Sequence, residues 1–239
     1  MNRRHALILA VVTLAFGAAP FLSEPFRGYP PEAFPVVIPR PSVQPAGYAF
    51  SIWALIYFLL LLHAVTFVWR RHDDADWLET APALTLSLLI GSVWLYIAPQ
   101  WPLLAEAAIL AMAVTALLAF LRADTFSDRL TLALPLGIYA GWLSAAAAVS
   151  TGVILAGYGI LSDTMAALAM LVLIVALVLG VQMRQPRAPE YGLTALWALI
   201  GVMAANWGQN VIVFLAATLA ALALAAAQGL LILRLRRGR

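Results

Sequence analysis

Four aromatic residues stand at helical spacing inside apolar stretches, where their rings could enclose a flat ligand. Trp53 and Tyr57 are four residues apart, and Tyr139 and Trp142 are three apart, so each pair lies on one face of a helix. Buried Trp and Tyr need a partner for their N–H and O–H groups, which a neighbouring helix or a polar ligand supplies. These faces fit either a ligand pocket or ordinary packing between helices, and spacing alone favours packing.

The remaining tryptophans divide by their place along the apolar stretches. Trp94 and Trp197 also lie inside such stretches. Four others lie close to the ends, where the rings of a membrane protein form an interfacial belt: Trp69, Trp77, Trp101 and Trp207. We therefore expect these four to be half in contact with water and to bind no ligand.

His63 is the main ionisable residue within an apolar stretch, and such a residue is a functional candidate by default. It could ligate haem or relay a proton, or it could be a neutral histidine bonded to a neighbouring helix, which we favour. No second histidine accompanies it within the predicted spans, so a two-histidine metal or haem site within one chain is not expected. Four acidic residues lie close to the ends of the stretches instead: Glu79, Glu106, Asp163 and Glu190.

No catalytic motif is present. The chain has neither Gly-x-Ser-x-Gly nor His-Glu-x-x-His, and it has no cysteine and no lysine. Thiolate chemistry, disulfides and Schiff-base catalysis are therefore excluded. The sequence predicts no catalytic residues, no metal site and no enzymatic activity.

Composition requires that the bilayer itself is the solvent of this chain. It is 64% hydrophobic and 10% charged, with a mean hydropathy of +0.94, which is more apolar surface than a soluble domain of this length can bury. The pI of about 9.6 would fit nucleic acid, but basic residues of membrane proteins mark cytoplasmic loops. We predict lipid as the surrounding partner and no nucleic acid.

Charged and turn-rich breaks divide the chain into eight apolar segments, each near the length of about 20 residues that a spanning helix needs. The predicted fold is therefore an all-α integral membrane protein with about eight transmembrane helices. The segments cover residues 5–22, 47–69, 79–98, 103–121, 131–154, 163–183, 191–207 and 211–233.

Arginine placement predicts the orientation. With the N terminus inside, twelve arginines face the cytoplasm and two, Arg27 and Arg40, face outside. This predicts a multi-pass protein of a bacterial-type inner (plasma) membrane with both termini cytoplasmic. The first segment also has the pattern of a signal peptide, but Pro20 directly after AFGAA argues against cleavage there, so we expect a retained helix.

Two short regions have a second interpretation. Residues 23–46 form a proline-rich loop, which proline stiffens without regular structure, and it is either a cover over an outward-facing cavity or a solvated linker. The stretch NWGQN, residues 206–210, either caps two helix ends, which we favour, or lines an entry path. The stretch 140–152 is rich in Ala, Gly and Ser, which permits close helix packing.

The stretch PAGYAFSIWALIY, residues 45–57, resembles the motif that opens the second helix of the TspO/MBR family, the tryptophan-rich sensory proteins. That motif runs Pro-Pro-Gly-Trp-x-Phe and continues with a Trp and, four residues later, a Tyr. The matching residues are Pro45, Gly47, Phe50, Trp53 and Tyr57. Later, LPLGIYAGWLSAA resembles the fifth-helix Pro-Tyr-x-x-Trp region, and SLLIGSVWLY keeps Trp94 but has Gly91 where the family has asparagine.

The resemblance covers about residues 1–154 and implies a TspO-like five-helix transmembrane core with the proline-rich loop 23–46 on the outside. Residues 155–239 would add three transmembrane helices and an arginine-rich cytoplasmic tail, so the chain resembles the longer members of this family.

The resemblance implies a pocket for porphyrins, haem-like tetrapyrroles or sterol-like molecules near the outward end. The ligand-binding residues that it and the helix faces indicate are Trp53, Tyr57, Trp94, Tyr139 and Trp142. We predict a sensor or transporter of a hydrophobic small molecule, with a porphyrin or haem-like group as the implied ligand. The alternatives are a structural subunit, docked through its Ala/Gly faces to a further copy or a membrane-complex partner, and, less favoured, a porphyrin-modifying enzyme.

Overall fold

The computed structural model describes residues 2–23, 26, 28–126 and 128–237, and within them every regular element is helical. The predicted all-α fold is confirmed. Eight α-helices follow one another along the chain: α1 (Asn2–Leu22), α2 (Ile52–Thr66), α3 (Ala75–Ile97), α4 (Pro102–Arg122), α5 (Leu134–Gly157), α6 (Asp163–Arg184), α7 (Glu190–Asn206) and α8 (Val211–Arg237). Four short helical turns lie between them: η1 (Pro31–Ala33), η2 (Gly47–Ser51), η3 (Phe67–Arg71) and η4 (Arg129–Ala133).

Seven of these helices are long and apolar enough to cross a membrane. In that count α2 extends through η2 and η3, and α5 extends back through η4. The exception is α7, which has 17 residues. The helix α3 begins four residues before the predicted segment 79–98, because the Asp74 carboxylate accepts a hydrogen bond from the Asp76 N–H at 3.1 Å and caps the helix.

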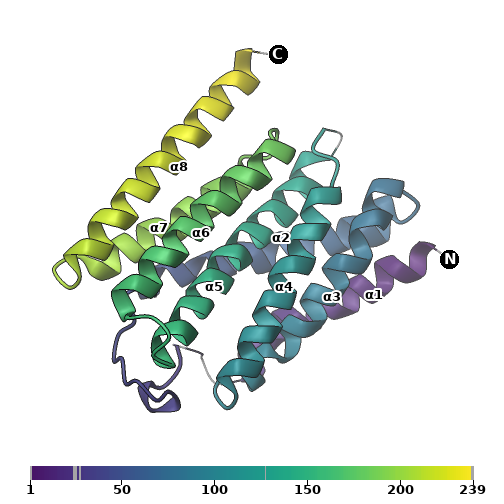
Figure 1. The fold of residues 1–239 in the computed structure, drawn as a ribbon. Coiled ribbons are helices and arrows are strands. Elements are labelled where there is room, and N and C mark those ends of the chain that lie inside the picture. The colour runs from purple at the N-terminus through teal and green to yellow at the C-terminus, as the bar shows by residue number, and fades with distance from the viewer. Residues whose placement is uncertain (1, 24–25, 27, 127, 238–239) are drawn as a thin grey trace.

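The helices form a bundle around α5 (Figure 1). On one side lie α1, α3 and α4, where α3 packs between the other two, and on the other side α6 and α7 pack on α5 with α8 outside them. An 18-residue stretch of α5 is 78% buried in the protein, against at most 44% in the other long helices. The helix α5 is therefore the core of the bundle.

Small residues let the other helices approach α5 closely. A Cβ atom placed on Gly141 would lie 2.5 Å from the carbonyl oxygen of Tyr191, so only glycine permits this contact between α5 and α7. Hydroxyl groups join the same helices, since the Tyr191 O–H donates to Ser144 Oγ at 2.9 Å. This is the close packing that small residues allow in membranes.

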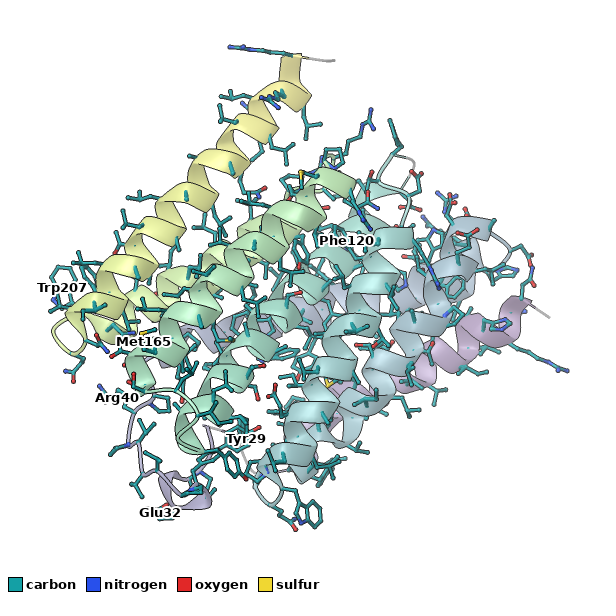
Figure 2. All side chains as sticks on the ribbon, in the orientation of Figure 1. Tyr29, Glu32, Arg40, Phe120, Met165 and Trp207 are labelled. Carbon is teal, nitrogen blue, oxygen red and sulfur yellow. The ribbon has the colours of Figure 1, made fainter. Side chains whose placement is uncertain are left out.

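The segment 28–46 crosses one end of the bundle and is hydrogen-bonded to three helices there. Ser42 donates its N–H and its hydroxyl to the two carboxylate oxygens of Asp163, at 2.9 and 2.5 Å. The Asn206 amide donates to the Ser42 carbonyl at 2.8 Å, and the N–H of Val36 donates to the Gly157 carbonyl at 2.9 Å. Tyr29, Glu32 and Arg40 of this segment appear together at that end in Figure 2.

The turn between α7 and α8 shows what the asparagines of NWGQN do. Asn210 accepts a hydrogen bond from the Val213 N–H at 3.2 Å and caps α8, while Gly208 has φ +69°, which glycine adopts without strain. The capping interpretation is confirmed for Asn210. Asn206 instead holds the loop through Ser42.

Candidate ligand-binding pocket

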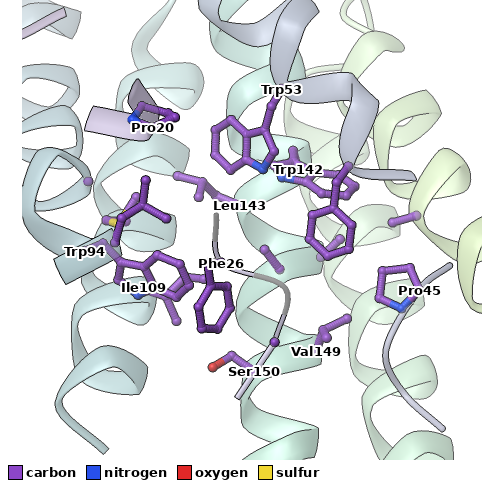
Figure 3. A pocket seen from close by; sticks show the side chains of 18 of the residues that line it. Pro20, Phe26, Pro45, Trp53, Trp94, Ile109, Trp142, Leu143, Val149 and Ser150 are labelled. Carbon is purple, nitrogen blue, oxygen red and sulfur yellow. The ribbon is translucent and has the colours of Figure 1, made fainter. Parts of the chain in front are cut away.

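A cavity of about 330 Å³ lies between α1, α2, α3, α4 and α5, under the segment 28–46. Its walls are almost entirely apolar, and Figure 3 shows Trp53, Trp94 and Trp142 turned toward it from three different helices. The lining residues from the helices include Phe16 and Pro20 of α1, Trp53 and Tyr57 of α2, Gly91 and Trp94 of α3, Ile109 and Met112 of α4, and Trp142, Val149, Ser150 and Val153 of α5. The loop contributes Phe26, Tyr29, Gln44 and Pro45.

Four of the five residues predicted from the sequence line this cavity: Trp53, Tyr57, Trp94 and Trp142. Tyr139 lies behind the wall, where it is fully buried. Its hydroxyl pairs with Ser87 Oγ at 2.9 Å, and its ring packs against Phe16 with 5.9 Å between the centroids. The structure therefore places Tyr139 as a support for Phe16 and outside the cavity wall.

The aromatic side chains of the wall hold one another in fixed orientations. Trp53 stacks on Tyr57 with 5.5 Å between the ring centroids, and it meets Trp142 edge-on at 6.2 Å. Phe16 lies against Trp53 and Tyr57 at 6.0 and 5.4 Å. Offset and edge-to-face pairs of this kind stabilise each other, so the rings of the wall support one another.

The indole N–H groups of the wall differ in their bonding. Trp94 donates to the Ala105 carbonyl at 3.0 Å, which fixes its ring to α4. The N–H of Trp142 is buried and has no partner among the described residues. A buried donor without an acceptor is unfavourable, so Trp142 offers a hydrogen bond to whatever enters.

The turn η2, which leads into α2, is positioned by α7. Trp197 donates its indole N–H to the Ala49 carbonyl at 3.0 Å, and the Ala46 N–H donates to the Gly201 carbonyl at 2.9 Å. A Cβ on Gly201 would lie 2.9 Å from Pro45 Cβ and from Ala49 Cβ. Sequence reasoning placed Trp197 inside a helix but gave it no role, because the contact joins residues about 150 positions apart.

The chain was compared with known protein families. A family model described as TSPO-like protein matches residues 39–230, which is most of the chain. The chain belongs to the TSPO-like protein family. The resemblance seen in the sequence is thus confirmed, and the chain is a multi-pass membrane protein of this kind. Comparison with curated protein sequences and with solved structures found no match.

The TSPO-like match contains most of the cavity wall and extends beyond it. It begins within the loop and reaches into α8, so it includes Trp53, Trp94 and Trp142, together with the α7 residues that support η2. Phe16, at the centre of the aromatic contacts, comes from α1 and lies outside the matched residues. The division of the chain at residue 154 stays a prediction.

Gly91 stands where the TspO/MBR motif has asparagine, and the structure shows what fills that place. A Cβ on Gly91 would lie 2.5 Å from Cε2 of Phe16 and 2.9 Å from Cε of Met112. The Phe16 ring therefore occupies the space that a larger side chain at position 91 would need. In this protein the ring of Phe16 therefore lies where the family motif would place the amide side chain of an asparagine.

Polar atoms gather at one end of the cavity, where Tyr29 and Ser150 form part of the wall. Thr151 donates its hydroxyl to Glu106 Oε1 at 2.6 Å behind them. Burial raises the pKa of the Tyr29 phenol; the Ser150 hydroxyl lowers it and the charge of Glu106 raises it. Sequence reasoning placed Glu106 near a helix end with no function, since its loop partner Tyr29 follows no periodic pattern.

His63 and Trp77 lie at the opposite end of the bundle, away from the cavity wall. His63 is buried, its Nδ1 lies 2.8 Å from the Thr131 carbonyl oxygen, and its ring stacks on Trp77 at 4.5 Å between centroids. The structure supports the neutral, bonded histidine. The interfacial-belt interpretation is wrong for Trp77, which is 1% exposed, whereas Trp69, Trp101 and Trp207 are exposed as a belt requires.

Proposed function

We propose that this TSPO-like protein binds a hydrophobic, ring-containing small molecule in the aromatic cavity and acts as a sensor or transporter rather than as a catalyst. The observation that carries the proposal is the convergence of Trp53, Tyr57, Trp94 and Trp142 from three helices on one cavity. Ligand sites in proteins are concave, mostly apolar and aromatic, with few polar groups. Tetrapyrrole-like and sterol-like molecules both have the required flat or fused rings.

The size of the cavity bears on the ligand. A volume of about 330 Å³ is at the lower end of the range for sites that hold drug-sized molecules. A compact fused-ring molecule therefore fits within the walls, and a tetrapyrrole would extend past them toward the loop. No histidine lines the cavity among the described residues, which favours a ligand held by its ring faces over one held through a metal ion.

The loop between α1 and α2 would control how a ligand enters the cavity. Phe26 meets Trp94 edge-on at 5.0 Å, Tyr29 meets Phe26 at 5.3 Å, and Phe34 meets Tyr29 at 5.6 Å. Residues 36–46 are bonded to α5, α6 and α7. Entry past the loop thus requires that aromatic contacts open near Phe26 and Tyr29 while the second half of the loop stays in place.

The proposed setting follows from the arginine pattern. We infer a bacterial-type inner membrane with both termini in the cytoplasm, because twelve arginines then face inside. The loop and the cavity mouth would face outward. The ligand would be enclosed from the outer side.

Titration of purified protein with protoporphyrin IX, followed by quenching of tryptophan fluorescence, tests the proposal. We expect saturable quenching in wild type, and affinity about tenfold weaker in Trp53→Ala and Trp142→Ala, since each change removes a large ring from the wall. Trp69→Ala is the matched control, because Trp69 is 79% exposed. Trp77→Ala is a second control, because Trp77 is buried like the wall residues but does not line the cavity. This change should leave the affinity of the folded protein for protoporphyrin IX unchanged.

Equal loss of affinity in all four variants would contradict the assignment of the pocket. Quenching that never saturates in wild type would remove the tetrapyrrole from the proposal and favour a structural subunit of a larger membrane complex. Co-purification of a stoichiometric partner would support that second reading.

A further inference from the structure

Three buried polar atoms with unused hydrogen-bonding capacity lie at one end of the mostly apolar cavity, two of them in its wall and one close by. They are the hydroxyl oxygens of Tyr29 and Ser150, which are near enough to interact with each other, and the Oε2 atom of Glu106, which has no hydrogen bond to any described residue. Ser150 is 6% exposed and Glu106 is 9% exposed. Tyr29 and Ser150 are part of the cavity wall, and Figure 3 shows the Ser150 oxygen at its lower side. We refer to these three residues as the polar end.

The groups around the polar end leave part of its hydrogen-bonding capacity unused, even with Tyr29 and Ser150 interacting with each other. Thr151 lies within hydrogen-bond distance of both Glu106 Oε1, at 2.6 Å, and the Ala147 carbonyl, at 2.9 Å, so its single proton is already shared. Leaving a buried donor or acceptor unpaired costs about 1–3 kcal/mol, and more for a charged group. A molecule that brings hydrogen-bonding groups to this end of the cavity therefore gains free energy that a purely apolar molecule does not.

The charge of the polar end selects among such molecules. Glu106 forms no ion pair with any residue that the structure describes, and the described wall of the cavity contains no charged side chain. The carboxylate of Glu106 is close enough to Tyr29 to raise its pKa, and that pKa is already raised by burial. The phenol therefore stays protonated at neutral pH, and among the described residues at this end the acidic side chain is that of Glu106, in a poorly screened site.

We infer that the ligand carries an uncharged or cationic hydrogen-bonding group, a hydroxyl or an amine, that binds at Tyr29 and Ser150 close to Glu106, and that this end rejects a carboxylate. The inference rests on the proposed function and adds the chemistry of the ligand's polar group. An O–H or N–H group donates toward the carboxylate and the hydroxyl oxygens, whereas an anion would be repelled. A molecule with a carboxylate, such as protoporphyrin IX, would bind with that group turned away from the polar end.

A series of probes with one ring system and different polar groups separates these effects. The probes are pyrene, 1-pyrenylmethanol, 1-pyrenylmethylamine and pyrene-1-carboxylate, titrated into protein in an uncharged detergent and followed by energy transfer from tryptophan. We expect the alcohol and the amine to bind wild type about tenfold more tightly than the carboxylate. Pyrene itself measures the aromatic cavity without any polar group.

Variants then assign the preference to the polar end. Glu106→Gln removes the charge and still accepts a hydrogen bond from Thr151, and it should lower the amine-to-carboxylate affinity ratio about tenfold. Ser150→Ala and Tyr29→Phe should weaken the alcohol about threefold to tenfold and leave pyrene unchanged. Glu79→Gln removes an exposed acid from the other end of the bundle and should change nothing.

The outcomes distinguish this inference from the proposed function. Saturable binding of pyrene with no preference among the polar groups, or a preference that Glu106→Gln leaves intact, would overturn the inference and keep the proposed function. Failure of every probe to bind saturably, pyrene included, would overturn both. Each ratio compares two probes on one variant, so partial loss of folded protein does not change it.

Discussion

The Phe16 ring shows how one missing side chain shapes the cavity. It lies where a Cβ on Gly91 of α3 would be, and it also contacts the rings of Trp53, Tyr57 and Tyr139. Since these rings leave Phe16 little room to move, the identity of residue 91 decides where the wall of the cavity lies. The asparagine of the TspO/MBR motif would not fit here unless Phe16 moved into the cavity.

Gly91→Ala tests this arrangement. The added Cβ would lie 2.5 Å from Phe16 Cε2, so we expect a lower melting temperature and weaker binding of pyrene, measured in detergent by a thermal shift and by energy transfer. Gly180→Ala is the control, since nothing lies within 4 Å of its Cβ position, and alanine there should leave stability unchanged or raise it by about 0.5–1 kcal/mol. Wild-type behaviour of Gly91→Ala would contradict the tight fit of Phe16.

At the level of residues, sequence reasoning reached those parts of the pocket that follow local patterns. The four-residue spacing of Trp53 and Tyr57 and the motif around Trp142 place these rings on definite helix faces, and the structure brings them to one cavity. The polar end was not predictable in this way. Tyr29 comes from an irregular loop, and in the sequence Glu106 resembles any acid near a helix end.

Among the elements, α7 has the clearest indirect role. It contacts η2 through Trp197 and Gly201, and η2 carries Phe50 and leads directly to Trp53. A helix that contributes little to the cavity wall therefore sets the position of two wall residues. This gives one physical reason why the helices after α5 belong to the same structure as the pocket.

Gly201→Ala should weaken protoporphyrin IX binding severalfold although residue 201 is not part of the cavity wall. The new Cβ would lie 2.9 Å from Pro45 Cβ and Ala49 Cβ, so η2 must shift away from α7. Gly229→Ala, on α8 with nothing within 4 Å of its Cβ position, is the matched control. If both variants bind like wild type, η2 does not depend on its contact with α7.

The loop provides a second prediction at this scale. Asp163→Ala removes both hydrogen bonds that Ser42 donates, and we expect faster amide hydrogen exchange at residues 36–46, because these bonds tie the loop to α6. Glu32→Ala, which changes an exposed acid of the same loop, should leave the exchange as in wild type. Unchanged exchange in Asp163→Ala would show that the remaining bonds to α5 and α7 are sufficient.

The sequence predicted the number and order of the helices well, because segments of about 20 apolar residues have one stable solution in lipid. It did not predict how the loop is held. Ser42 and Asp163 are 121 residues apart, and no local pattern connects them. For the same reason, the proline content of the loop agreed with both interpretations, a cover over the cavity and a solvated linker. The hydrogen bonds to α5, α6 and α7 show that residues 36–46 are fixed over the end of the bundle.

For the whole molecule, the orientation in the membrane is open to a direct test, because the chain has no cysteine of its own. In whole bacterial cells, we expect a maleimide that cannot cross membranes to label Arg40→Cys, and to label Arg236→Cys only after the inner membrane is permeabilised. Both positions are exposed. The reverse labelling pattern would contradict the arginine-based orientation and would turn the mouth of the cavity toward the cytoplasm.

The burial of α5 also has a consequence for the order in which the molecule is built. During synthesis α5 enters the bilayer before α6 and α7 exist, so the face that they later cover, including Gly141 and Ser144, first meets lipid. Assembly must then exchange those lipids for helices. A nascent chain that ends after α5 exposes this face, and the bundle reaches its final form only when the last third of the chain has been made.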